Sequence, residues 1–302
     1  MKLRIIYMGT PDFAVPSLEI LIENGYDVAA VVTTPDKPAG RGLNMQYSAI
    51  KETALKHNLP VLQPEKLKDE AFIEELRSSQ ANLFIVVAFR MLPEIVWQMP
   101  SIGTFNLHGS LLPKYRGAAP INWAIINGET ETGCTTFFLK HQIDTGDILL
   151  QEKTKILSED TFETVYNKLK VLGAGLVLKT VKLIESDNYT LQQQTGESIH
   201  APKIFKETGL INWNNKGGDI INLIRGLNPF PSAWFIYNGK TYKVFKAAVE
   251  TSSPTTVTGT IESDGKTYIK ISCADSNISL MEIQAEGKKR MSVSDFLKGN
   301  KI

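Results

Sequence analysis

Cysteine and long apolar segments are both scarce in this sequence of 302 residues. The two cysteines, Cys134 and Cys273, are far apart, which argues against a disulfide framework and against a thiolate metal site. The longest uninterrupted apolar run is residues 83–89, whereas a helix that crosses a bilayer needs about 20 apolar residues. The first residues, MKLRIIYMGT, lack the apolar core and cleavage site of a signal peptide. We therefore expect a cytoplasmic protein in a reducing setting.

A large excess of one charge is also missing, since the formal net charge is +1. The balance nevertheless differs along the chain. Residues 1–200 carry 19 Lys and Arg against 23 Asp and Glu, a net charge of −4, whereas residues 201–302 carry 14 against 9, a net charge of +5. A basic C-terminal third indicates a surface that meets a polyanion, although ordinary compositional variation explains the same numbers. Apolar residues, 42% of the chain, suffice for a sizeable core, and the length fits two domains or one large one.

Short apolar runs alternate with helix-like stretches through the first half of the chain. Residues 82–89, NLFIVVAF, are apolar almost throughout, as in a central parallel strand that is buried on both faces. This alternation predicts a doubly wound, mostly parallel α/β sheet, in which ligands bind beyond the carboxyl ends of the strands at a topological switch point. The expected strands are residues 3–9, 28–34, 61–62 and 82–89, and the expected helices are residues 15–24, 48–57, 69–78 and 93–99.

The pattern changes after a long amphipathic stretch at residues 161–185. Residues 186–203 are polar, rich in Gln and poor in large apolar side chains, which is typical of a linker. Beyond them, a helix at residues 219–227 precedes several short runs of period two, which predict a small β-barrel of the OB-like kind. We therefore expect an α/β domain at residues 1–185, a linker at 186–203 and a β-barrel domain at 204–302.

Polar side chains that suit acyl transfer lie in two short segments. In GTFNLHGSLLPKYRGAAP, residues 103–120, Asn106 and His108 are two positions apart and point to the same side of an extended strand. Farther on, IDTGDI places Asp144 and Asp147 around a glycine turn. A carboxylate beside the histidine would stabilise the protonated imidazole, and the asparagine amide could stabilise an oxyanion. No serine or cysteine has a nucleophile context and no spacing indicates a metal site, so direct acyl transfer to an amine fits best.

Each of these residues also has an ordinary structural explanation. Asn106 could cap a helix, His108 could be a polar residue with a satisfied hydrogen bond, and Asp144 could begin an Asx turn. Spacing alone does not decide between the two explanations. The other histidines, His57, His141 and His200, lie in contexts that favour the structural one.

Taken together, these residues resemble the signature of a known family. The string NLHGSLLPKYRGAAP, with IDTGDI downstream and MGTPDFA near the N-terminus, is similar to the formyltransferases that use 10-formyltetrahydrofolate. Over its whole length, including the C-terminal domain, the chain looks like the methionyl-tRNA formyltransferase branch of that family. The resemblance implies a Rossmann-like catalytic domain followed by an OB-like domain that binds tRNA.

The resemblance also implies a mechanism. The α-amine of methionine on initiator tRNA attacks the formyl carbon, and Asn106 holds the oxyanion of the tetrahedral intermediate. His108 assists the oxyanion or relays a proton, while Asp144 orients His108 and accepts the proton of the amine. 10-Formyltetrahydrofolate is the co-substrate, and no metal is expected. The folate contacts would fall on Ser110, Leu111, Leu112 and Pro113.

Two basic regions are expected to contact the tRNA. The loop PDKPAGRG, residues 35–42, carries Lys37 and Arg41 and matches the loop that inserts against the acceptor stem in the family. The C-terminal domain offers further cations that can follow a phosphate backbone, although each one alone is also explained as a solvated surface charge. These cations are Lys203, Lys206, Lys240, Lys243, Lys288, Lys289 and Arg290.

One segment departs from the family pattern. Many relatives have a Tyr-Gly pair after the apolar strand that borders the folate pocket, whereas this chain has Phe89 and Arg90. The phenol is lost and a guanidinium is gained, so contacts from side chains are altered while contacts from the backbone can persist. We therefore expect Ala88 and Phe89 to form part of the pocket wall.

Several alternatives share this signature. A formyltransferase that acts on an amino-sugar nucleotide has a very similar motif, glycinamide ribonucleotide formyltransferases are shorter and lack the basic tail, and a formyltetrahydrofolate hydrolase uses water as the acceptor. A non-catalytic RNA-binding protein on the same fold would not need Asn106, His108 and Asp144 together. The PAGRG loop and the charge difference favour tRNA as the partner, and we expect a monomer without a membrane partner.

Overall fold

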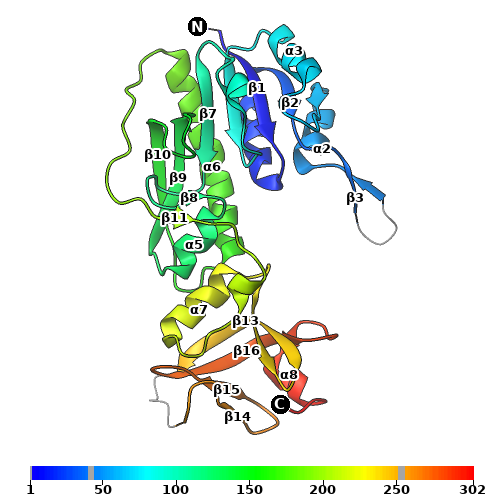
Figure 1. The fold of residues 1–302 in the computed structure, drawn as a ribbon, viewed down its shortest axis with the longest axis vertical. Helices are drawn as coiled ribbons and strands as arrows, with labels where there is room; N and C mark the ends of the chain where they lie inside the picture. Colours follow the sequence, from blue (N-terminus) through cyan, green and yellow to red (C-terminus); the bar gives the residue numbers. More distant parts are fainter. Residues whose placement is uncertain (1, 40–43, 251–255) are drawn as a thin grey trace. The chain divides into compact units, whose positions relative to one another are not determined.

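The computed structural model describes residues 2–39, 44–250 and 256–302 (Figure 1). Packing divides the chain into two compact units. Unit 1 comprises Met1–Gly117, Thr132–Thr154 and Tyr166–His200, and unit 2 comprises Ala118–Glu131, Lys155–Val165 and Ala201–Ile302. Two stretches of the first 200 residues therefore pack with the C-terminal third.

Unit 1 is built on a seven-stranded sheet. In the order in which they lie side by side, its strands are β10 (Ile148–Lys155), β9 (Glu131–Phe138), β7 (Gly103–His108), β6 (Leu83–Val87), β1 (Arg4–Gly9), β2 (Asp27–Val32) and β5 (Val61–Leu62). Neighbours from β7 to β5 are parallel, and β9 is antiparallel to β7. After β5 the chain crosses to the other side of β1 to form β6, so the topological switch point lies between β1 and β6.

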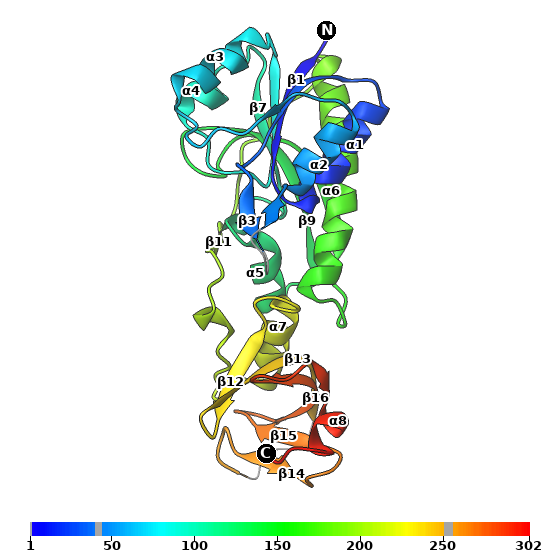
Figure 2. The same cartoon turned by 90° about the vertical axis from the view of Figure 1, so that its right-hand side faces the viewer.

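Helices cover both faces of this sheet. Figure 2 shows α3 (Glu70–Ser78) and α4 (Glu94–Trp97) on one face and α1 (Val15–Glu23), α2 (Ala49–Lys56) and α6 (Phe162–Glu185) on the other. All five residues of β6 are buried, as its apolar run predicts for a central strand. On the α3 face, Phe72 and Leu76 pack in one apolar cluster with Ile6 and Phe84. The predicted doubly wound α/β fold is confirmed.

Unit 2 contains a curled antiparallel sheet. Its strands, in spatial order, are β12 (Ala233–Tyr237), β13 (Lys240–Glu250), β16 (Asn277–Ala285), β15 (Ile269–Ser272) and β14 (Ile261–Ser263), and β17 (Met291–Ser292) pairs with β16. Register shifts between Val244 and Ala247 interrupt the β13–β16 ladder, and such irregularities bend a strand. From β12 to β14 the sheet curls into a half-barrel. This agrees with the small β-barrel domain that the sequence predicts.

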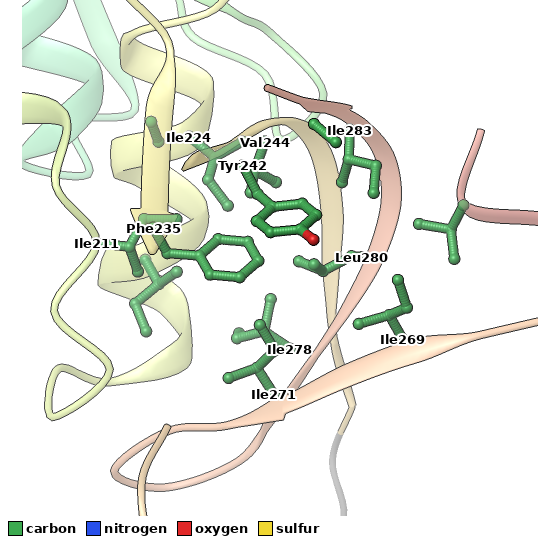
Figure 3. Close-up of a cluster of buried hydrophobic side chains, with 14 of the residues drawn as sticks. Ile211, Ile224, Phe235, Tyr242, Val244, Ile269, Ile271, Ile278, Leu280 and Ile283 are labelled. Carbon is green, nitrogen blue, oxygen red and sulfur yellow. The ribbon is translucent and has the colours of Figure 1, made fainter. Parts of the chain in front are cut away.

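The core of unit 2 lies on the inner side of this sheet (Figure 3). Phe235 and Tyr242 stack with their ring centroids 5.3 Å apart. Ile224, from α7 (Gly217–Gly226), and Leu280, from β16, belong to the same buried cluster, which also takes up Phe296 of α8 (Val293–Leu297). Aromatic and branched side chains thus join the sheet and two helices into one core.

Helix α5 (Pro120–Ile126) belongs to unit 2 because it packs closely on α7. A Cβ at Gly226 would lie 2.6 Å from Cγ1 of Ile126, so glycine permits this approach. The side-chain amide of Asn122 donates a hydrogen bond to the carbonyl O of Gly226 at 2.7 Å. Residues 118–131 are thereby held to the C-terminal third of the chain.

The segment expected as a linker is hydrogen-bonded to unit 1 along part of its length. Gln192 forms an antiparallel bridge with Ile148. Farther along, β11 (His200–Ala201) pairs with β8 (Arg116–Gly117), and the backbone N–H of Arg116 donates to the carbonyl O of Ile199 at 3.0 Å. A polar composition indicated exposure of this segment but did not indicate these backbone contacts.

Candidate active site

Strand β7 carries two of the predicted catalytic side chains. Asn106 and His108 lie on the same face because side chains alternate along a strand. Asn106 is opposite Val86 on β6 and Phe137 on β9, and His108 is the last residue of β7. Asn106 is partly exposed, whereas His108 is only 6% exposed. Both therefore lie toward the carboxyl end of the strand, at the edge of the sheet where ligands bind in doubly wound folds.

The imidazole of His108 is held between a carbonyl and a carboxylate. Its Nε2 lies 2.8 Å from the carbonyl O of Tyr115, which can only accept a hydrogen bond, so Nε2 carries a proton. Its Nδ1 faces Oδ2 of Asp144 at 3.9 Å. This distance allows an ion pair when the imidazole is protonated, but it is too long for a direct hydrogen bond. The ring orientation leaves Nδ1 as the nitrogen that can gain or lose a proton beside Asp144.

Asp144 lies in a tight turn that aims its carboxylate at His108. Its φ of 54° is in the left-handed region, which aspartate tolerates better than most residues. Two positions later, a Cβ at Gly146 would lie 1.6 Å from the carbonyl O of Phe138, so glycine is required there. The backbone N–H of Gly117 donates to Oδ2 of Asp144 at 2.9 Å. Close packing and this hydrogen bond together fix the carboxylate.

The second aspartate of the IDTGDI turn has different surroundings. Asp147 pairs with Lys140, whose side chain is about half exposed, at 2.8 Å. By contrast, the side chain of Asp144 is 13% exposed and lies next to His108. The structure therefore brings Asp144, and not Asp147, to the imidazole.

Asn106 completes the predicted trio on the same face of β7 as His108. Among the residues that the structure describes, its side-chain amide has no hydrogen-bond partner. The amide is also not among the fully buried polar groups that lack a partner. Its two N–H donors are accordingly available to a ligand. An amide donor and an imidazole on one strand, with a carboxylate beside the imidazole, can stabilise an oxyanion and move a proton.

Two family models match nearly the whole chain. One, described as formyl transferase, matches residues 1–181, and the other, described as the formyl transferase C-terminal domain, matches residues 203–301. The chain belongs to the formyl transferase family.

Curated relatives within this family match from end to end. A methionyl-tRNA formyltransferase of Bacteroides thetaiotaomicron is 52% identical over 310 residues, which cover 99% of this chain and 96% of the relative. A methionyl-tRNA formyltransferase of Syntrophus aciditrophicus is 45% identical over 306 residues, with 100% and 97% covered.

Solved structures share the fold at lower identity. WlaRD, a sugar 3N-formyl transferase, has a TM-score of 0.70 and 23% identity, covering 96% of this chain and 100% of its own. HypX from Aquifex aeolicus, solved in complex with tetrahydrofolic acid, has a TM-score of 0.66 and 17% identity, covering 99% of this chain and 48% of its own. At these identities the likeness extends to the fold alone.

The loop after β7 holds the four residues that we expect to contact folate. Ser110 is fully buried, and its Oγ donates to a carbonyl of the same loop at 2.7 Å. Leu112 is also buried, and its backbone N–H donates to Oγ1 of Thr135 at 3.1 Å. Leu111 and Pro113 are partly exposed. Ser110 and Leu112 are therefore engaged in contacts within the protein. Of the four residues, Leu111 and Pro113 are the ones that a ligand can reach.

The segment that departs from the formyl transferase pattern follows β6. Ala88 is exposed with a φ of 49°, and Phe89 packs in part against the apolar cluster beneath α3. The guanidinium of Arg90 donates to the carbonyl oxygens of Pro64 at 2.8 Å and of Glu65 at 3.1 Å. Burial lowers the pKa of Arg90 from its usual value. The gained cation is thus bound by the loop that follows β5.

The predicted acceptor loop begins as a short hairpin of β3 (Lys37–Ala39) and β4 (Asn44–Gln46). Lys37 is exposed, and Arg41 lies outside the described residues. Next to the hairpin, Nζ of Lys51 donates to Asp36 at 2.5 Å and to Oε1 of Gln63 at 2.8 Å. Sequence reasoning missed this network, whose members are 12 to 27 positions apart. It fastens the start of the hairpin to α2 and to the end of β5.

Two predicted tRNA contacts of unit 2 are exposed cations next to aromatic rings. Nζ of Lys203 lies 5.6 Å from the ring centroid of Phe205, and Nζ of Lys206 lies 5.6 Å from that of Trp234. Arg290 differs from them, because it pairs with a carboxylate at 2.6 Å. Lys203 and Lys206 therefore present charge to solvent, while Arg290 is used within the fold.

Among the described residues there is neither a metal-binding cluster nor a membrane-spanning helix. No group of three or more His, Cys, Asp or Glu side chains there could hold a metal ion. None of the helices described is both long enough and apolar enough to span a membrane.

Proposed function

We propose that this protein transfers the formyl group of 10-formyltetrahydrofolate to the α-amine of methionine on initiator tRNA. The observation that carries the proposal is the 52% identity, from end to end, to a methionyl-tRNA formyltransferase. The contact between His108 and Asp144 adds chemical support, because it supplies an acid–base pair at a ligand-binding sheet edge.

The reaction is an acyl transfer in which one C–N bond forms and another breaks. The amine nitrogen attacks the formyl carbon and gives a tetrahedral intermediate with a negatively charged oxygen. Asn106 donates N–H groups to that oxygen, which a preorganised donor stabilises without reorganisation. Collapse of the intermediate breaks the bond to the folate nitrogen, which leaves with a proton.

His108 and Asp144 handle the protons in this scheme. Nε2 of His108 is engaged with Tyr115, so Nδ1 is the atom that exchanges a proton beside Asp144. Oδ2 of Asp144 accepts from Gly117, and within the described residues Oδ1 has no partner. We assign to Oδ1 the acceptance of the proton released by the amine, directly or through His108.

The tRNA would be bound by basic residues of both units. Lys37 and Arg41 belong to the acceptor loop, and Lys203 and Lys206 are the cations of unit 2 that we favour for the phosphate backbone. Ala88 and Phe89, with the loop after β7, would line the folate site. We further propose that the enzyme works as a monomer in the cytoplasm, where its aminoacyl-tRNA acceptor is found.

The acceptor is tested by incubating the purified protein with 10-formyltetrahydrofolate and either Met-tRNA or an amino-sugar nucleotide. We expect formylation of Met-tRNA only. Formylation of the sugar alone would replace this proposal by the sugar reaction of the distant structural relatives. Binding of tRNA without formylation of either acceptor would favour a non-catalytic RNA-binding protein.

A further inference from the structure

The turn that carries Asp144 has a support fifty residues downstream, in the segment expected as a linker. Nε2 of Gln194 donates to the carbonyl O of Asp144 at 2.9 Å and to the carbonyl O of Gly146 at 2.8 Å. One side-chain amide thus binds both ends of a three-residue turn. Asp144 has its left-handed backbone conformation in this same turn.

Gln194 is itself held by a cation. Nε and Nη2 of Arg116 donate to Oε1 of Gln194 at 3.1 and 2.7 Å. A cation that binds the oxygen of an amide polarises it, which strengthens its N–H groups as donors. A chain of hydrogen bonds therefore leads from the guanidinium through Gln194 to the backbone of the turn.

The two neighbours of Arg116 hold the reacting side chains. The carbonyl O of Tyr115 binds Nε2 of His108, and the N–H of Gly117 binds Oδ2 of Asp144. Residues 115–117 thus fix the imidazole, the carboxylate and, through Gln194, the turn that carries the carboxylate. Because one short segment makes all three contacts, a shift of the turn relative to this segment changes the distance between Nδ1 and Oδ2.

A role limited to fastening residues 186–203 fits the contacts less well. Backbone hydrogen bonds already attach this segment without Gln194. Gln192 and Ile148 exchange two of them, at 2.7 and 3.0 Å, and Arg116 donates one to Ile199 at 3.0 Å. Removing the Gln194 amide leaves these bonds in place and deletes the donors to the turn.

We propose that Gln194, polarised by Arg116, is a positioning residue that sets the geometry of Asp144 against His108 during formyl transfer. The proposal rests on the roles given to Asp144 and His108 under the proposed function. In this role Gln194 acts through the backbone of the turn, to which its amide donates both hydrogen bonds.

The first test compares Gln194→Met, Gln194→Glu and the control Gln193→Met. Glutamate keeps an acceptor for Arg116 but has no N–H for the turn, so both Gln194 variants should lose kcat by about 10- to 100-fold. KM for both substrates should stay within about twofold, since no binding contact is removed. Gln193 is exposed, so its variant should match the wild type. A Gln194→Glu enzyme with wild-type kcat, or an equal loss in Gln193→Met, would overturn the proposal.

The second test does not need turnover. The chain has four histidines, so the ring ¹⁵N signals of His108 can be assigned by comparison with His108→Ala. Both Gln194 variants should shift these signals, whereas Gln193→Met should not. Unchanged signals would overturn the proposal even if activity falls. If the wild type formylates no Met-tRNA, the proposed function fails, while this measurement still decides whether Gln194 positions the pair.

A double-mutant cycle tests the part played by Arg116. If Arg116 acts through Gln194, the double variant Arg116→Met with Gln194→Met should lose no more kcat than about the larger of the two single losses. Losses that multiply would show that the two side chains act independently and would remove Arg116 from the proposal.

Discussion

The His108–Asp144 pair and the cations of unit 2 are held in opposite ways. His108 is buried and the side chain of Asp144 is largely shielded, and backbone groups of Tyr115 and Gly117 fix their orientation. Lys203 and Lys206 are exposed, with aromatic rings as neighbours. Fixed groups suit a reaction that depends on sub-ångström placement, whereas exposed cations suit a backbone of many phosphates. Under the proposed function, the first region is expected to set the rate and the second to set the affinity for tRNA.

The largest effect is expected for His108→Ala. Removing the imidazole eliminates proton transfer beside Asp144, so formylation should slow by about 10³-fold or more. Binding of tRNA should stay within about twofold of wild type, since His108 is buried away from a phosphate backbone. Single-turnover formylation and filter binding measure the two quantities. Near-normal turnover would contradict the catalytic role of this residue.

A smaller effect is expected for Asp144→Asn, with Asp147→Asn as its matched control. Asparagine keeps an oxygen that can accept from Gly117 but removes the charge beside His108, so kcat should fall by about 10²-fold. Asp147 pairs with Lys140 at a more exposed position, so its variant should stay within about twofold. Equal losses in the two variants would mean that the turn as a whole matters rather than the carboxylate at Asp144.

The sequence predicted best those features that depend on residues close together in the chain. Asn106 and His108 share a strand face by alternation, and the apolar run at residues 82–89 identifies a buried strand. The meeting of His108 with Asp144 came from the family resemblance, because the two are 36 positions apart and spacing does not reveal a turn's direction. Their catalytic roles, like the folate and tRNA contacts, stay predictions.

Other features were hidden because composition reports polarity and not hydrogen bonding. Strand β9 buries Thr132, Thr135 and Thr136, so its pattern is not that of an apolar run. Gln194 lies in a Gln-rich stretch that reads as a solvated linker, although its amide binds the Asp144 turn. The association of α5 with α7 depends on Gly226, which lies one hundred positions beyond Ile126. Such contacts join distant segments and leave no local signal.

The network beside the acceptor loop predicts a change in affinity without a change in rate. Asp36→Asn removes the charge that Lys51 binds, so the hairpin should be held less firmly and KM for Met-tRNA should rise by about fivefold with kcat unchanged. Because Lys51 and Gln63 lower the pKa of Asp36, this contact stabilises the fold above the ordinary carboxyl pKa of about 3.9 and is lost as pH falls below it. Glu52→Gln, an exposed change on α2, is the control. A fall in kcat would place the network in the reacting region instead.

The smallest effects are expected for Lys203→Ala and Lys206→Ala. Each should raise KM for Met-tRNA by about threefold and reduce the slope of log KM against log salt concentration by about one, because one phosphate contact is lost. Lys298→Ala is the control, since Lys298 pairs with Asp295 on unit 2. Steady-state kinetics between low and moderate salt measure the slopes. An unchanged slope together with a lower kcat would contradict the comparison between the two regions. The exposed lysine would then affect the reaction rate and not the electrostatic binding of tRNA.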